Sequence, residues 1–146
     1  MPLSRRQFIA AGSASLGMLR AGSAAALGLT TLRAEPVNAQ VLPEGDGATA
    51  LWGFNGSSPG PELRFRRGDT LSVRFENGID QGSAVHWHGI RLQNAMDGVP
   101  YLTQPMVESG DSFDYKFVLP DAGTYWYHSH NRSWEQVARG LYGPLI

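Results

Sequence analysis

The chain has 146 residues, and its 12 lysines and arginines against 13 acidic residues give a formal net charge of −1. This balance argues against a basic nucleic-acid-binding surface, so no nucleic-acid partner is expected. The sequence has no cysteine, which excludes a disulfide framework and the thiolate ligands that structural zinc sites usually recruit.

The N-terminus has the features of an export signal. Arg5 and Arg6 lie in the run Ser-Arg-Arg-Gln-Phe-Ile, which is typical of substrates of the twin-arginine export machinery. The Ala- and Gly-rich stretch that follows is interrupted by Arg20 and is too weakly apolar for a membrane span. Val37-Asn38-Ala39 matches a small-residue cleavage site. The protein is therefore expected to be periplasmic or otherwise exported.

These features predict three segments. Residues 1–39 are expected to form the twin-arginine signal peptide, residues 40–47 a lead-in linker, and residues 48–146 one folded domain. The sequence stops at Gly143-Pro144-Leu145-Ile146, within a predicted strand. We therefore expect the domain to be truncated from a longer chain.

Beyond residue 47 the pattern is one of short strands separated by turns. Period-two alternation is clearest over 70–76 and 112–119. The predicted strands are 48–54, 62–66, 70–76, 84–92, 112–119, 124–130 and 140–146, with a loop over 94–104 and a short helical turn within 131–139. Strands at these intervals predict an all-β, antiparallel β-sandwich or barrel. We expect the apolar faces of 70–76 and 113–119 to face each other across the core.

All four histidines of the chain fall in two pairs of identical spacing, His86-Trp87-His88 and His128-Ser129-His130. Residues i and i+2 of a β-strand point to the same face, so each pair can direct both imidazoles to one place. Imidazole is a common ligand for copper, zinc, iron and nickel, and an all-histidine set suits copper, zinc or iron with open coordination positions. The spacing therefore predicts a metal site shared by two strands.

The motifs together resemble the first cupredoxin (plastocyanin-like) domain of multicopper oxidases, closest to the bacterial laccase-like and copper-resistance branch. The resemblance covers nearly all of residues 48–146. It rests on Asn55-Gly56, Pro59-Gly60-Pro61, Arg67-Gly68-Asp69, His86-Trp87-His88-Gly89, Met96-Asp97-Gly98-Val99-Pro100, Gly123 through His130 and Gly140 through Ile146. It implies a Greek-key cupredoxin-like sandwich.

The resemblance also implies a function. Such oxidases take electrons from a small-molecule or metal-ion donor at a type 1 copper and reduce O₂ to water at a trinuclear cluster. By position in the motifs, His86 would bind the type 2 copper, His88 and His128 one type 3 copper, and His130 the other. Asp97 stands where the family keeps an acid that assists proton delivery, although an aspartate before Gly98 also fits a plain turn residue.

The chain departs from the family in what it lacks. It has no cysteine for a type 1 copper and none of the four further histidines that complete the cluster. It is therefore expected to supply half of the trinuclear site, with later cupredoxin domains of the same protein as partners, and to be inactive alone. The alternative is a small, non-catalytic periplasmic copper-binding or storage protein, in which Met96 and Met106 could assist with Cu(I).

Overall fold

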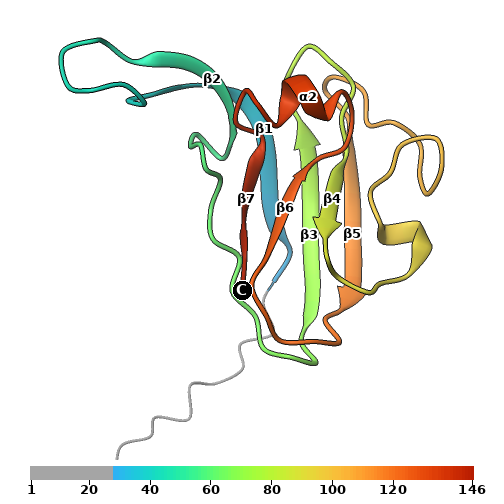
Figure 1. Cartoon of the computed structure of the whole chain (residues 1–146). Coiled ribbons are helices and arrows are strands. Elements are labelled where there is room, and N and C mark those ends of the chain that lie inside the picture. Colours follow the sequence, from blue (N-terminus) through green and yellow to red (C-terminus); the bar gives the residue numbers. More distant parts are fainter. Residues whose placement is uncertain (1–27) are drawn as a thin grey trace, which may run out of the picture.

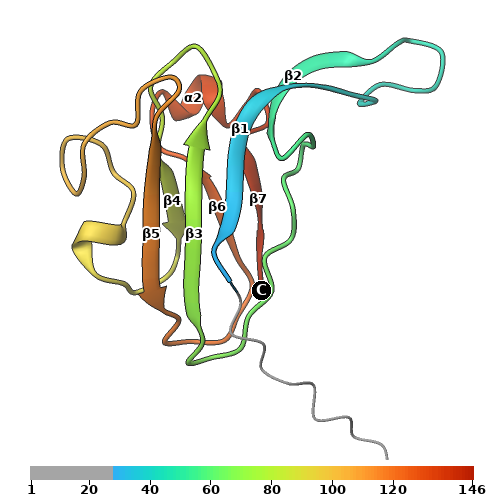
Figure 2. The same ribbon diagram turned by 180° about the vertical axis from the view of Figure 1, so that it is seen from behind.

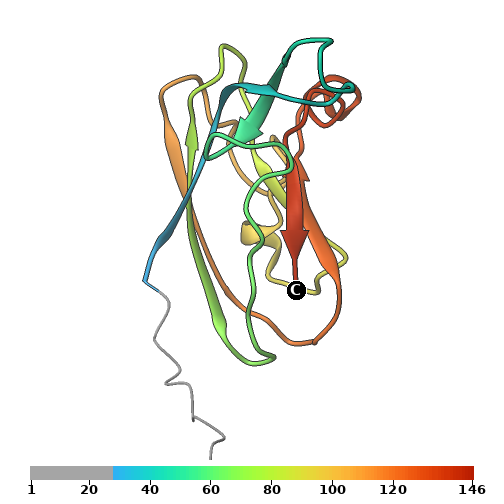
Figure 3. The same cartoon turned by 90° about the vertical axis from the view of Figure 1, so that its left-hand side faces the viewer.

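The computed structural model describes residues 28–146, which form two β-sheets packed face to face (Figures 1, 2 and 3). The first sheet has the strand order β2-β1-β3-β5, and the second has the order β4-β6-β7. The strands are β1 (Thr30–Ala39), β2 (Thr49–Phe54), β3 (Thr70–Asn77), β4 (Val85–His88), β5 (Ser112–Val118), β6 (Tyr125–Ser129) and β7 (Tyr142–Leu145). The all-β prediction is therefore confirmed.

Helical structure in this part of the chain is confined to short elements. The 3-10 helix η2 (Asn94–Met96) lies in the loop between β4 and β5, and α2 (Ser133–Gln136) follows β6. Within residues 28–146 no helix has the length and apolar character needed to cross a membrane. Every pair of neighbouring strands is antiparallel except β1 and β3, which run parallel.

The core lies between the two sheets and combines aliphatic and aromatic side chains. Leu71, Val73 and Phe75 alternate along β3 and are fully buried, as period-two patterning predicts. They meet the buried rings of Trp87 and Tyr127 from the second sheet. Burial of each such side chain contributes about 1.5–3 kcal/mol, so the core gives the second sheet a rigid support.

The predicted arrangement of two strands is wrong. Residues 70–76 and 113–119 do not face each other across the core, because β3 and β5 are hydrogen-bonded neighbours in one sheet, with Phe75 opposite Phe113. Alternation identifies the buried face of a strand but does not say whether another strand lies beside it or opposite it. Phe75 and Phe117 are buried as expected, and Phe113 is only partly buried.

The structure also describes part of the predicted signal-peptide and linker segments. Residues 30–39, assigned to the signal peptide, form the inner strand β1, which pairs with both β2 and β3. Its Leu32 and Ala34 are fully buried in the core. Residues 40–47 are the exposed turn between β1 and β2 rather than a lead-in linker. The twin-arginine motif at Arg5 and Arg6 lies outside the described residues.

We expect any processed form of the protein to keep the whole of β1. Cleavage after Ala39 would remove an inner strand, expose the edge of β3 and leave β2 without its partner. A second small-residue tripeptide, Ala24-Ala25-Ala26, precedes this strand. N-terminal sequencing and intact mass of such a processed form should therefore give a first residue before Thr30. A folded product that starts at Gln40 would contradict this.

Other predicted strands are shorter in the structure. Residues 62–66 form no strand, and only Leu63 makes an isolated bridge, to Leu145 of β7. Pro59 and Pro61 stand just before this segment and remove backbone donors. The strand predicted over 84–92 ends at His88, because Gly89 adopts a φ of +85° that turns the chain.

Candidate metal centre

The four histidines lie together on the outer face of the three-stranded sheet, next to one another across β4 and β6. His86 stands opposite His128 in the antiparallel register, and His88 stands opposite Trp126. One ligand nitrogen from each of His86, His88 and His128 lies within 4.8 Å of the other two. The ring of His130 is 5.2 Å from that of His86 and 6.2 Å from that of His128, centre to centre. The convergence expected from the spacing is therefore present.

The residues between the histidines hold both strands in place. Trp87 and Tyr127 are paired in register and point to the opposite face, where both are fully buried. The Trp87 ring makes edge contacts with Tyr115 and Phe117 of the other sheet. The hydroxyl of Tyr115 accepts a hydrogen bond from the Val85 amide at 3.0 Å, just before His86. Alternation thus divides each strand into a core side and an imidazole side.

Backbone carbonyls orient two of the imidazoles. Nδ1 of His86 lies 2.7 Å from the Asp97 carbonyl oxygen, and Nδ1 of His128 lies 2.8 Å from the Ser129 carbonyl oxygen. A carbonyl oxygen can only accept, so each Nδ1 carries the hydrogen and each Nε2 keeps a free lone pair. Nε2 of His128 is 3.3 Å from Nδ1 of His88. These nitrogens therefore face one another as potential ligands.

His128 is the most buried histidine of the group, with 6% of its surface exposed. The pKa of His128 is lowered to about 4, chiefly by burial; the hydrogen bond to the Ser129 carbonyl opposes this, and the nearby His86, His88 and His130 add smaller lowering effects. At neutral pH this imidazole is therefore uncharged. That is the form that binds a metal ion.

Trp126 packs against the histidine cluster, next to His88 and His128. Its ring stacks on His128 at a centre-to-centre distance of 4.1 Å and lies 5.0 Å from the ring of His88. Trp126 is two residues before His128, so it shares the imidazole face of β6 and remains 36% exposed. Trp87 and Trp126 both occupy packing positions, and the Trp126 ring is the one that stacks on a histidine.

Asp97 is brought against His86 by the loop between β4 and β5. Its carbonyl makes the hydrogen bond described above, and its carboxylate oxygen Oδ1 lies 3.5 Å from the same ring nitrogen. The next residue, Gly98, has a φ of +78°, and a Cβ there would overlap the carbonyl oxygen of Val85. Only glycine therefore allows this loop to approach β4 so closely.

The two methionines considered as Cu(I) ligands occupy structural positions. The Met96 sulfur accepts a hydrogen bond from the Lys116 amide at 3.3 Å, and its side chain packs against the core cluster. It thereby attaches η2 to β5. The Met106 side chain lies against Gly82. Neither methionine belongs to the histidine group found among the described residues.

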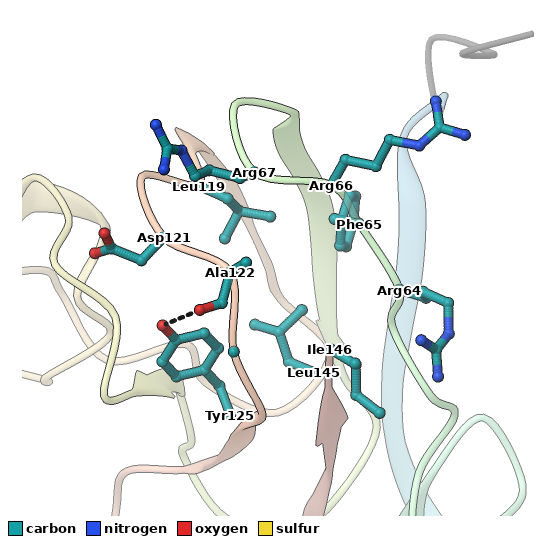
Figure 4. A pocket seen from close by; sticks show the side chains of 11 residues that line it. Arg64, Phe65, Arg66, Arg67, Leu119, Asp121, Ala122, Tyr125, Leu145 and Ile146 are labelled. Carbon is teal, nitrogen blue, oxygen red and sulfur yellow. Dashed lines mark hydrogen bonds between the residues drawn. The ribbon is translucent and has the colours of Figure 1, made fainter.

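A separate cavity of about 170 Å³ contains none of these histidines (Figure 4). It is lined by the 64–67 segment, the turn between β5 and β6, and the ends of β6 and β7. Phe65, Leu119, Leu145 and Ile146 give it apolar walls, and the Tyr125 hydroxyl donates to the Ala122 carbonyl at 3.5 Å. The cavity has no cluster of metal-binding side chains, so the histidine face is the candidate site.

The donor set fits a metal ion that prefers imidazole. Two nitrogens bound about 2.0–2.1 Å from one ion at a tetrahedral angle are about 3.3–3.4 Å apart, close to the 3.3 Å that separates His88 Nδ1 from His128 Nε2. No carboxylate or thiolate joins the three-histidine group in residues 28–146. All-nitrogen donation favours copper or zinc over magnesium or calcium.

The geometry defines the class: a two-sheet β-sandwich that carries a histidine cluster able to hold a metal ion on one outer face. The sequence profile described as multicopper oxidase matches residues 37–146. The chain therefore belongs to the multicopper oxidase family.

Individual relatives agree with this assignment. Copper resistance protein A of Pseudomonas syringae pv. tomato is 48% identical over 64% of this chain, which corresponds to 15% of that protein. Laccase-2 of Botryotinia fuckeliana is 42% identical over 75% of this chain and 19% of its own length. The chain spans less than a fifth of the length of these curated relatives.

Solved structures confirm the cupredoxin-like fold. Lac15 from a marine microbial metagenome is 65% identical with a TM-score of 0.78, over 81% of this chain and 32% of that one. A multi-copper oxidase from Pseudomonas Thermotolerans is 50% identical with a TM-score of 0.76, over 80% of this chain and 28% of that one.

Proposed function

We propose that this domain supplies four histidine ligands, half of a trinuclear copper cluster, to an exported multicopper oxidase that reduces O₂ to water. Copper, when bound, supplies the one-electron redox chemistry. The observation that carries the proposal is the convergence of His86, His88 and His128 within ligand distance, with His130 beside them.

The contacts among the histidines support particular roles. His88 and His128 face each other through Nδ1 and Nε2, so we assign this pair to one type 3 copper. The rings of His86, His128 and His130 lie 5.2–6.2 Å from one another, and His86 and His130 would bind the type 2 copper and the second type 3 copper, respectively. The Asp97 carboxylate beside His86 is partly exposed and would assist proton delivery to the site.

The other wall of the site is proposed to come from later cupredoxin domains of the same protein. His88 is exposed, and large apolar side chains are exposed close in sequence to the site residues: Tyr101 and Leu102 after Asp97, and Trp134 after His130. Where such groups form a contiguous patch, they mark an interaction surface. The type 1 copper, which accepts electrons from a small-molecule or metal-ion donor, would be bound by those later domains.

Copper titration of the whole chain tests the proposal. Replacing His88 and His128 together with alanine should weaken Cu(II) binding by at least about 100-fold, because ligands affect affinity at least as strongly as their supporting contacts. The control is Lys116→Ala, an exposed position on β5 of the other sheet, which should leave the affinity unchanged. Equal affinity in all three proteins would refute the ligand assignment.

The same preparations test whether the chain is half of a site. With Cu(II) and a phenolic donor, we expect no sustained O₂ uptake, because the chain has no cysteine for a type 1 copper and only four histidines. Steady turnover measured with an oxygen electrode, and abolished by the double histidine substitution, would show that the chain is complete as an oxidase.

A further inference from the structure

Gln136 is a fully buried polar residue directly beyond the second histidine pair. It is the last residue of α2, and 0% of its surface is exposed. A buried amide is costly unless its hydrogen bonds are satisfied. Its position in the fold therefore requires specific partners.

Those partners all lie in the segment that leads into β4. The Gln136 side-chain oxygen accepts a hydrogen bond from the Ser83 hydroxyl at 2.9 Å. Its nitrogen donates to the Gly82 carbonyl at 3.1 Å and to the Gln81 side-chain oxygen at 3.3 Å. Asn131 donates to the same Gly82 carbonyl at 2.6 Å. One amide thus joins the segment after His130 to the segment before His86.

The backbone of Gln136 extends this connection to β6. Its carbonyl accepts from the Leu141 amide at 3.1 Å, and the Leu141 carbonyl accepts from the Ser129 amide at 3.0 Å. Ser129 stands between His128 and His130. Gln136 is therefore linked to both strands that carry the histidines.

His130 depends on these links more than the other histidines do. The rings of His86, His88 and His128 each have a hydrogen-bond partner, whereas the ring of His130 has none among residues 28–146. His130 also lies one residue beyond the end of β6. Its backbone amide donates a hydrogen bond to the Ala84 carbonyl at 3.0 Å. Ala84 directly follows residues 81–83, to which the Gln136 side chain is hydrogen-bonded.

The turn after His130 needs such support. Arg132 has a φ of +44°, a left-handed conformation that L side chains rarely adopt. Strained positions of this kind persist where surrounding contacts hold them. The Gln136 and Glu135 amides both donate to the Arg132 carbonyl, at 2.9 and 2.7 Å. The side-chain bonds of Gln136 then fix this turn against the start of β4.

We propose that Gln136 is a positioning residue that holds His130 at its distance from His86. This rests on the proposed role of His130 as a copper ligand. The hydrogen bonds of the buried amide set the separation between the two strand ends, and His130 follows because, among residues 28–146, its ring has no hydrogen bond that would correct a shift.

A double-substitution cycle on the whole chain tests this. Gln136→Leu should weaken Cu(II) binding about tenfold, as loss of a supporting contact does. In a His130→Ala background it should have no further effect, because it acts through His130. Ser83→Ala removes one bond of the amide and should give a smaller loss with the same dependence on His130, so the test stands even if Gln136→Leu folds poorly.

The control separates positioning from general destabilisation. Val73→Ala, in β3 of the other sheet, removes buried core volume without touching either histidine segment. Its melting temperature should fall while Cu(II) affinity is retained. If Gln136→Leu weakens binding equally with and without His130, or not at all, the positioning role is refuted. If His130→Ala alone leaves Cu(II) binding unchanged, the proposed role of His130 fails instead.

Discussion

Replacing Gly98 with alanine is expected to destabilise the domain and to weaken Cu(II) binding. Gly98 has a φ of +78°, and an added Cβ would overlap the Val85 carbonyl oxygen and come within 3.0 Å of the His86 Cα atom. The left-handed conformation alone costs about 1–2 kcal/mol. The overlap involves backbone on both sides, so the loop must move away from β4 and carry Asp97 away from His86.

Gly110 provides a matched control for this prediction. It has a similar φ of +88°, but an added Cβ would meet no atom within 4 Å. Gly110→Ala should therefore show only the conformational cost of about 1–2 kcal/mol. For Gly98→Ala we expect a loss of at least about 3 kcal/mol, in the range of severe backbone or packing changes. Urea unfolding and Cu(II) titration of both variants measure this, and equal effects on stability would contradict it.

Acid is expected to destabilise the copper-free domain through His128. The unfolded chain takes up a proton near the ordinary histidine pKa of about 6.5, whereas burial lowers the pKa of His128 in the folded chain to about 4. The unfolded state therefore binds more protons between these values, and stability is lost as the pH falls from about 6.5 to about 4. The pKa difference corresponds to about 3 kcal/mol at most.

His128→Gln isolates this contribution, because glutamine is polar and does not titrate in this range. Urea unfolding with a chelator at pH 7.5, 5.5 and 4 should show the wild-type chain losing up to about 3 kcal/mol more than the variant. The other three histidines are present in both proteins, so the difference belongs to His128. Parallel loss of stability in the two proteins would rule out this origin.

The sequence predicted those features that depend on local alternation. The strands near 49–54, 70–77 and 112–118 were predicted because polar and apolar residues alternate between recognisable turns. The grouping of the histidines was predicted for the same reason, since a spacing of two places both imidazoles on one face of a strand. The register of His86 opposite His128 then brings the two pairs together.

Features that depend on contacts between distant segments could not be predicted in this way. In β1 the alternation of Leu32 and Ala34 is short and follows an Ala-rich stretch, and the small residues around Ala39 resemble a cleavage site. Gln136 had no local signal, because its partners are more than fifty residues away. The contact between the Asp97 backbone carbonyl and His86 also had no signal in the sequence, where only the Asp97 carboxylate was considered. The carbonyl oxygen lies closer to the His86 ring than the carboxylate does.

The division of β4 and β6 into two faces has a consequence for the order of assembly. The side chains that build the interior, Trp87 and Tyr127 among them, pack against one another, while the imidazoles lie on the far side of the same strands. In proteins where the ion is part of the core, metallation and folding are a single event. Here we therefore expect the polypeptide to acquire its final shape first and to bind metal afterwards.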